Sequence, residues 1–357
     1  RGIVHEVGDA AATYDFAHAR LRDVTYESTS VARRRLLHRR TADAYRSLGT
    51  SAGPQLGRLA RTAHHEREAG RTDEASLAFE EAGQLARRVY ANREALAYLE
   101  AAIALGHPDD TGINLAIGEV RTRGGDFAGA SAAFEMAAAS ASPEHLGGIE
   151  QRVGRIHLRR GDAVRADAHF AAALAALDAQ EEVSGPARSR IFADRAIAAV
   201  RAGDREGAAS FATEAHALAA GDAAAVVDAD RILGLLARER GDLAESRTLL
   251  ERSLAAAASL DDPLPAIAAT NGLVLVTADQ GDTDAAIELA EAVLATARRT
   301  GERHLEAAIE NNLADALESA GRREDAMEHL KAAARAFAEV GGCLLYTSDA
   351  ADDNRLV

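Results

Sequence analysis

The chain has 357 residues, of which 47% are hydrophobic and only 4% aromatic, and it carries a formal net charge of −15. Such acidity disfavours a nucleic-acid-binding protein, because contacts to phosphate supply much of that affinity and need positive charge. A single cysteine, Cys343, excludes an internal disulfide or a cysteine-based zinc site. The alanine-rich, aromatic-poor composition favours helices packed through small side chains over sheets.

Residues 14–47 differ from the rest of the chain. A short aromatic piece, Tyr14-Asp15-Phe16, leads into an arginine-rich stretch, and the first 50 residues carry 9 Arg against 6 Asp plus Glu, a balance of +3. We expect residues 13–17 to form the only strand of the chain, with helices after it. The two histidines of this stretch, His18 and His38, lack a third ligand at a suitable spacing, so we predict no metal site.

This stretch resembles the segment that closes the winged-helix region of large bacterial STAND-type ATPases. The matching pattern is Phe-x-His, then Arg-Asp-x-x-Tyr, then Arg-Arg-x-x-His-x-x-x-Ala, and it falls on Phe16, His18, Arg22, Asp23, Tyr26, Arg34, Arg35, His38 and Ala42. It is most similar to regulators of the LuxR (MalT-like) and SARP types. The resemblance implies that residues 1–50 are the C-terminal part of a winged-helix-like segment. It also implies a nucleotide-binding domain before Arg1, because the chain has no GxxxxGK[ST] phosphate loop.

A repeated pattern occupies residues 51–342, in which a glycine is followed five residues later by a small residue. From the second glycine onward the spacings are 36, 42, 38, 40 and 40 residues, and an extra helix at 92–105 fills the longer gap before it. Glycine tolerates the left-handed backbone that ends a helix, and the aspartate that often follows can cap the next helix. The predicted turn glycines are Gly70, Gly125, Gly161, Gly203, Gly241, Gly281 and Gly321.

Two further positions recur around each turn. A large residue often stands four after the small one, at Phe79, Phe134, Phe170, Leu250 and Leu330, and a Gly or Ala often stands seven before the turn, at Ala63, Gly118, Gly154, Ala196, Gly234 and Ala314. The pattern resembles the tetratricopeptide repeat, with a longer period. We predict an all-α fold, a tetratricopeptide-like helical-hairpin solenoid preceded by a short winged-helix remnant. A helical bundle with chance Gly-Asp turns is the alternative.

The C-terminal residues 343–357 break the pattern. They contain the only cysteine, and Cys343 to Asp353 reads as the translation of a sequence that resembles a transposon-based sequencing adapter. We expect this tail to be adapter read-through. Because the sequence also opens without methionine, we expect a fragment cut at both ends.

The sequence offers no catalytic constellation. There is no Gly-x-Ser-x-Gly elbow, and His64-His65-Glu66 does not continue into the HExxH zinc motif. Pairs of neighbouring carboxylates, such as Asp261-Asp262, fall where capping and solvation explain them. We therefore predict that the chain is not an enzyme and holds no cofactor and no metal.

Binding residues are predicted on the first helix of each hairpin, which lines the concave face in stacks of this kind. Aligned on the turn glycines, the candidate groove residues are Gln151, Arg155, Arg159, Arg231, Arg238, Asn271, Asn311 and Asp315. Four arginines there would suit an acidic peptide or an anionic effector. The alternative is that these arginines pair with nearby carboxylates and remain solvated.

Taken together, these features predict a non-catalytic repeat scaffold for protein interaction or effector sensing. We expect it to be a fragment of a multidomain bacterial signalling ATPase, a transcriptional regulator, that binds a protein, a peptide or a small effector in its groove. A free-standing tetratricopeptide scaffold without an ATPase is the alternative. No apolar run approaches the roughly 18 residues of a membrane span, and no signal peptide opens the sequence, so we expect a cytoplasmic protein that contacts neither membrane nor nucleic acid through this part.

Overall fold

A computed structural model of the chain describes residues 4–6, 14–48, 55–180 and 184–340. The tail predicted to be adapter read-through, 343–357, lies outside these residues. The chain divides into two compact units, Arg1–Asp109 and Asp110–Val357, and each is described by itself. Helices dominate both, and the predicted tetratricopeptide-like solenoid is confirmed. The winged-helix remnant stays a prediction.

The first unit opens with a small antiparallel sheet. Strand β1 (Val4–Glu6) pairs with β2 (Tyr14–Phe16), with Val4 opposite Phe16 and His5 opposite Asp15. The expectation that residues 13–17 form the only strand was therefore wrong. A lone strand leaves its backbone donors and acceptors without partners, so it needs a second one. Three residues of β1 are too few to show an alternating pattern in the sequence.

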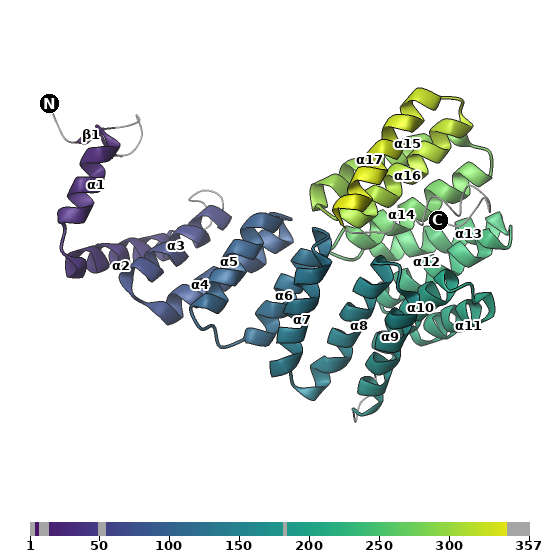
Figure 1. The fold of residues 1–357 in the computed structure, drawn as a ribbon, viewed down its shortest axis with the longest axis horizontal. Coiled ribbons are helices and arrows are strands. Elements are labelled where there is room, and N and C mark those ends of the chain that lie inside the picture. The colour runs from purple at the N-terminus through teal and green to yellow at the C-terminus, as the bar shows by residue number, and fades with distance from the viewer. Residues whose placement is uncertain (1–3, 7–13, 49–54, 181–183, 341–357) are drawn as a thin grey trace. The chain divides into compact units, whose positions relative to one another are not determined.

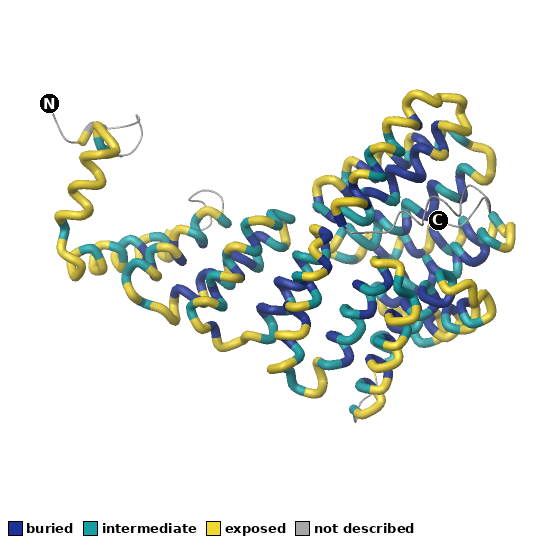
Figure 2. The backbone as a smooth tube through the Cα atoms, in the orientation of Figure 1, coloured by how far each residue is buried: buried dark blue, intermediate teal, exposed yellow. Residues whose placement is uncertain are grey.

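Five helices complete the first unit: α1 (Ala19–Ser28), α2 (Val31–Ser47), α3 (Gln55–Ala69), α4 (Thr72–Arg88) and α5 (Asn92–Ala104). Helix α1 has no buried residue and appears exposed along its length in Figure 2. Helices α2 to α5 pack in sequence order, each against the next. Gly70, with φ of +76°, ends α3 in the left-handed conformation.

The second unit consists of paired helices, which run from blue through teal and green to yellow in Figure 1. Its described residues form the pairs α6 (Asp110–Arg123) with α7 (Phe127–Ser140), α8 (Pro143–Arg159) with α9 (Ala163–Asp178), α10 (Gly185–Arg201) with α11 (Arg205–Leu218), α12 (Ala223–Glu239) with α13 (Leu243–Ala257), α14 (Leu264–Asp279) with α15 (Thr283–Thr300), and α16 (Arg303–Ser319) with α17 (Arg323–Glu339). Because no hairpin can bury its apolar face alone, neighbouring hairpins stack.

The turn inside each of these hairpins uses the same backbone device. All six turn glycines of the unit have a positive φ, between +78° and +84°. In five of the turns the next residue is an aspartate that caps the second helix by accepting a hydrogen bond from the backbone N–H three residues on, as Asp126 does from Gly129. Each cap satisfies an amide that the helix cannot pair internally. The last turn has Arg322 in this place and no side-chain cap.

Small residues in the first helix accommodate large ones in the second. A Cβ atom added to Gly154 would lie 2.5 Å from Cε1 of Phe170, and one added to Gly234 would lie 2.8 Å from Cγ of Leu250. Phe170 and Leu250 are both fully buried. Such crossings let the two backbones approach each other, and Figure 2 shows buried segments, in dark blue, along the helices of these hairpins.

Residues from the two ends of the second unit also touch. Val340, which caps α17, belongs to the same apolar cluster as Phe127 and Phe134 of the first hairpin, α6–α7. A Cβ atom on Gly125 would collide with the Val340 side chain. The array of hairpins in this unit is therefore closed by contacts between its first and last members.

Carboxylates are buried at helix interfaces in both units. Glu66 in α3 accepts from Arg46 and Arg71, while in the second unit Asp230 accepts from Arg252 and contacts His216, with Nδ1 of the histidine 2.9 Å away. Each carboxylate is paired with a cation from a neighbouring helix, which offsets the cost of removing its charge from water. These pairs explain buried acids without a catalytic role.

Candidate functional site

The predicted groove residues all lie on first helices of hairpins in the second unit. We refer to the side chains that α8, α10, α12, α14 and α16 present at these positions as the first-helix row. Helix α8 supplies Gln151, Arg155 and Arg159, helix α12 supplies Arg231 and Arg238, helix α14 supplies Asn271, and helix α16 supplies Asn311 and Asp315.

Asp194, in α10, joins three helices of the row. Its carboxylate accepts from Nε2 of Gln151 at 2.6 Å and from Nε of Arg155 at 2.8 Å, and Nη2 of Arg155 lies 3.5 Å from Asp228 in α12. Only 5% of Asp194 is exposed. Burial favours the neutral acid and raises the pKa of Asp194, but the donors on both of its oxygens favour the carboxylate, which we take as the state of the pair.

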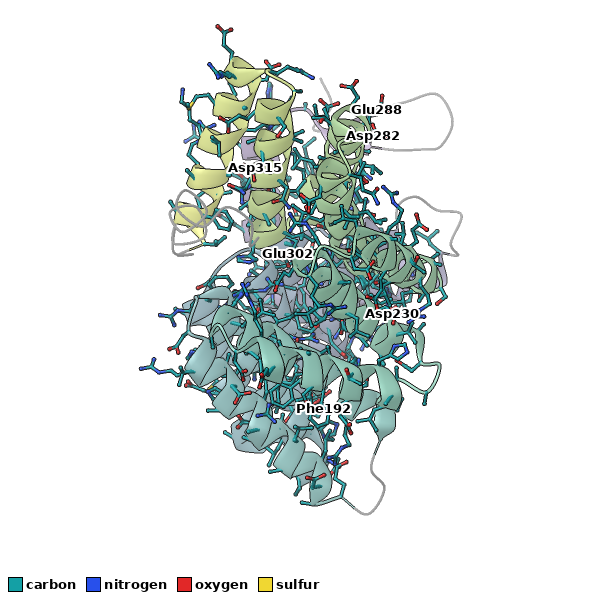
Figure 3. The ribbon with its side chains drawn as sticks, turned by 90° about the vertical axis from the view of Figure 1, so that its right-hand side faces the viewer. Phe192, Asp230, Asp282, Glu288, Glu302 and Asp315 are labelled. Atoms are coloured by element: carbon teal, nitrogen blue, oxygen red, sulfur yellow. The ribbon has the colours of Figure 1, made fainter. Side chains whose placement is uncertain are left out.

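A second ion pair spans most of the unit. Nη1 of Arg159, at the end of α8, lies 2.7 Å from Oε1 of Glu302, the residue that caps the start of α16, and the Glu302 side chain is 4% exposed. The two residues are 143 positions apart. Figure 3 labels Glu302 where the last hairpin, in yellow, meets the earlier, teal helices.

His304 is the second residue of α16, and it feels the charge of Arg159 from this pair. Burial first, and then the positive charges of Arg159 and Arg201, lower the pKa of His304 to about 3. Its ring packs edge-on against Phe337, with centroids 5.8 Å apart. His304 is therefore neutral at physiological pH and adds no charge to the row.

The remaining residues of the row are also largely partnered. Arg238 donates to Asp279 at 2.6 Å, and Asn271 accepts from Asn312 at 2.9 Å. Asn311 is buried, with 7% of its surface exposed. Desolvation first, and then the like charge of Glu318, raise the pKa of Asp315 to about 6, although Arg238 opposes the shift.

Arg231 is the exception among the four predicted arginines. It forms no hydrogen bond or ion pair with another residue that the structure describes. Arg155, Arg159 and Arg238, in contrast, are each bound to a carboxylate. The row is therefore a network of matched charges with one free guanidinium, and not the uniformly positive surface that the arginines suggest in isolation.

Three acids that pair with the predicted arginines, Asp194, Asp279 and Glu302, were not predicted from the sequence. Asp279 stands two residues before Gly281, the position that Arg159 holds before Gly161, so the same alignment already contained it. Asp194 stands nine residues before Gly203, one residue away from the position of Gln151 and Arg231. Glu302 could not be found in this way, because it lies in a turn between hairpins. It contacts Arg159 only because the fold of the unit brings together residues 143 positions apart.

The described residues hold no group of three or more His, Cys, Asp and Glu side chains arranged for a metal ion. In the first unit His64 and His65 are neighbours with ring centroids 5.2 Å apart, and Nδ1 of His65 lies 2.8 Å from Nδ1 of His38. Burial lowers the pKa of both His38 and His65, which keeps this pair neutral. Among the helices that the structure describes, none has the length and apolar character to cross a bilayer.

Comparison with known proteins agrees with the repeat architecture. Residues 265–339, which span α14 to α17, match the family model described as tetratricopeptide repeat. No curated protein sequence matches the chain.

Solved structures resemble the chain over most of its length. One is the Rap conjugation gene regulator of plasmid pLS20 in complex with the Phr* peptide, with 15% identity, a TM-score of 0.60, and coverage of 90% of this chain and 88% of that one. The apo quorum sensor NprR from B. thuringiensis is 14% identical, with a TM-score of 0.58 and coverage of 89% and 91%. A Rap protein complexed with competence and sporulation factor is 13% identical, with a TM-score of 0.58 and coverage of 87% and 98%. At these identities the likeness concerns the fold alone.

Proposed function

We propose that the chain is a non-catalytic scaffold that binds a peptide, a segment of a protein or a small effector along the first-helix row. The observation that carries the proposal is the continuity of this row, in which polar side chains of successive hairpins bond to one another from α8 to α12 and onward to α16. A ligand lying across several hairpins would meet donors and acceptors at regular intervals. Two of the similar solenoids were solved with a peptide or a signalling factor bound, which supports the same use here.

The charges of the row favour a ligand of mixed polarity. Paired arginines and carboxylates present both donors and acceptors, and leave little net charge to attract a purely acidic chain. Arg231, which is free of protein partners among the described residues, is the best anchor for one acidic group of the ligand. We therefore propose a peptide that offers one carboxylate and several main-chain groups.

Arg231 also provides the sharpest test. A phage library of random 12-residue peptides would be selected on the purified chain, and the enriched peptides titrated against the Arg231→Ala variant. We expect their affinity to fall at least tenfold, about 1.4 kcal/mol, since a charge-assisted hydrogen bond is lost. Arg323→Ala is the matched control, because Arg323 is exposed at the start of α17 and also lacks a described partner.

Two results would contradict the proposed binding surface. If no peptide is enriched, or if Arg231→Ala and Asn271→Ala both leave the affinity for the peptides unchanged, the first-helix row is not the binding surface. Charge reversal at Arg155 or Arg159 would be a poor test, because each would leave a buried carboxylate without its partner and would destabilise the fold by about 3–5 kcal/mol.

The wider context is a separate part of the proposal. We propose that the scaffold is part of a cytoplasmic signalling ATPase that regulates transcription, with residues 1–50 linking it to a winged-helix domain. The β1–β2 hairpin followed by α1 and α2 supports this arrangement. A free-standing scaffold fits the repeats equally well. Reading the genomic DNA upstream of the Arg1 codon decides between them: a phosphate-loop motif within a few hundred codons supports the ATPase, and a start codon just upstream supports the free scaffold.

A further inference from the structure

The first unit contains a pocket that none of the features above uses. Helices α3 and α5 both pack against α4, and between them lies a wide-open surface pocket with a volume of about 400 Å³. This volume falls within the usual range of small-ligand sites, about 300–1,000 Å³. Its lining residues are Ala60, Arg61, His64, Arg67, Phe79, Ala97, Tyr98 and Ala101.

The body of this pocket is apolar. Ala60, Ala97 and Ala101 have side chains too short to fill the space between α3 and α5, and Phe79 and Tyr98 add a pair of rings with centroids 6.2 Å apart. Phe79 is 5% exposed and is fixed in the core, while Tyr98 is half-buried. An aromatic or aliphatic group could cover these surfaces without disturbing the helices.

The polar part of the lining is cationic. Arg61, His64 and Arg67 come from α3 and are exposed, and no aspartate or glutamate lines the pocket, although the chain has 56 of them. Residues 19–71 contain 12 Arg against 5 Asp plus Glu, so their balance is +7 in a chain of net charge −15. The α3 side of the pocket, with Ala60, Arg61, His64 and Arg67, belongs to this positive stretch, whose field attracts anions.

Both arginines are held by rings and not by strong ion pairs. Cζ of Arg67 lies 5.6 Å from the centroid of Phe79, and Cζ of Arg61 lies 5.9 Å from that of Tyr45. Arg67 has only an exposed contact to Glu68 at 3.7 Å, and Arg61 has no carboxylate partner among the described residues. A guanidinium that lies against a ring keeps its N–H edge available for a carboxylate or a phosphate.

We propose that this pocket binds an anionic group attached to an apolar, preferably aromatic, body, with Arg61 and Arg67 as the anion contacts and the alanines, Phe79 and Tyr98 as the apolar surface. The same chemistry is found in a small aromatic carboxylate and in a peptide with an acidic residue beside an aromatic one. The site is independent of the first-helix row, because all of its residues belong to the first unit.

The test compares two probes of similar length and opposite charge, 3-(4-trifluoromethylphenyl)propionate and 3-(4-trifluoromethylphenyl)propylamine, by ¹⁹F NMR titration of the full chain. We expect saturable binding of the acid, and at least tenfold weaker binding of the amine. Equal binding of both probes, or no binding of the acid at 10 mM, would overturn the proposal.

Variants locate the effect. Arg61→Gln with Arg67→Gln should weaken the acid at least tenfold, and Ala97→Phe should block it by filling the cavity, while circular dichroism remains unchanged. Arg39→Gln with Arg40→Gln removes the same charge from exposed positions of α2 outside the pocket and should have little effect. An equal loss in this control would show a diffuse electrostatic effect and refute a defined site.

A third arm identifies the source of the ligand chemistry. A blocked peptide with the sequence Ala-Glu-Phe-Ala would compete with the fluorinated acid. Displacement at a lower concentration than unlabelled 3-phenylpropionate would indicate a protein segment as the natural ligand, and the reverse order would indicate a small molecule. Either order of displacement requires that the pocket between α3 and α5 binds the fluorinated acid. Neither order affects the peptide selection that tests Arg231 in the first-helix row.

Discussion

Gly154 offers a quantitative test of how the hairpins are packed. Replacing a glycine inside a helix by alanine normally stabilises the helix by about 0.8–1.0 kcal/mol. In α8, however, the new methyl would lie 2.5 Å from Cε1 and 2.7 Å from Cδ1 of the fully buried Phe170. Overpacking of this kind costs about 1–3 kcal/mol. We therefore expect Gly154→Ala to change the free energy of unfolding by between about zero and a loss of 2 kcal/mol.

A glycine in the same helix supplies the control. A Cβ atom on Gly148 would meet only the end of the flexible Arg152 side chain, at 3.2 Å, so Gly148→Ala should keep the helix-forming gain. The two variants should thus differ by about 1–3 kcal/mol, measured by urea unfolding with circular dichroism. Amide hydrogen exchange in α8 and α9 should be measured as well, because repeat arrays can unfold in parts.

A double-mutant cycle then assigns the cause. Phe170→Leu shortens the side chain that meets Gly154, so it should be tolerated better in the Gly154→Ala background than alone, with a coupling of about 0.5–3 kcal/mol. If Gly154→Ala stabilises the chain as much as Gly148→Ala does, the close crossing of α8 and α9 is not what selects glycine at position 154.

Three more expectations follow from single features. His304→Gln should reduce the loss of stability in acid. The folded chain keeps His304 neutral down to a pKa of about 3, whereas in the unfolded chain the histidine takes up a proton below about pH 6.5. The free energy of unfolding of the wild type should therefore fall as the pH drops through this window, by up to about 2 kcal/mol at pH 5, measured by urea titration. Gly241→Val should lower the melting temperature more than Gly241→Ala, because φ is +82° and nothing lies within 4 Å of a Cβ there, leaving backbone strain as the only penalty. Calorimetry should detect no saturable binding of magnesium-ATP at high micromolar concentration, since the chain lacks a phosphate loop.

Local chemistry made the hairpins predictable. A turn glycine and a capping aspartate act within a few residues, and the pairing of Gly154 with Phe170 depends only on the geometry of one hairpin. The sequence pattern therefore predicted the fold class and the positions of the turns. It did not predict β1, because three residues are too few to show a periodic pattern. The strand is formed by backbone hydrogen bonds to β2, which do not require particular side chains.

The candidate site was predictable only in part, for the same reason. Periodicity placed Arg155 and Arg231 on corresponding faces of α8 and α12, but whether each is free depends on neighbours in other hairpins. Asp279 could have been included from the same alignment, because it holds the position of Arg159. The pocket beside Phe79 needed the structure, since its opening results from three short side chains on two helices that are not consecutive in the chain.

The contact between Arg159 and Glu302 distinguishes the second unit from an open solenoid. In an open solenoid each hairpin contacts only its neighbours, and stability is close to a sum of local terms. Here a nearly buried ion pair joins α8 to the start of α16, and Val340 packs with Phe127, so hairpins far apart in the chain are coupled directly. A ligand on the first-helix row that altered the angle between successive hairpins would have to strain these two contacts. The free energy for such a change would have to come from stronger binding of the ligand to the changed arrangement than to the one described here.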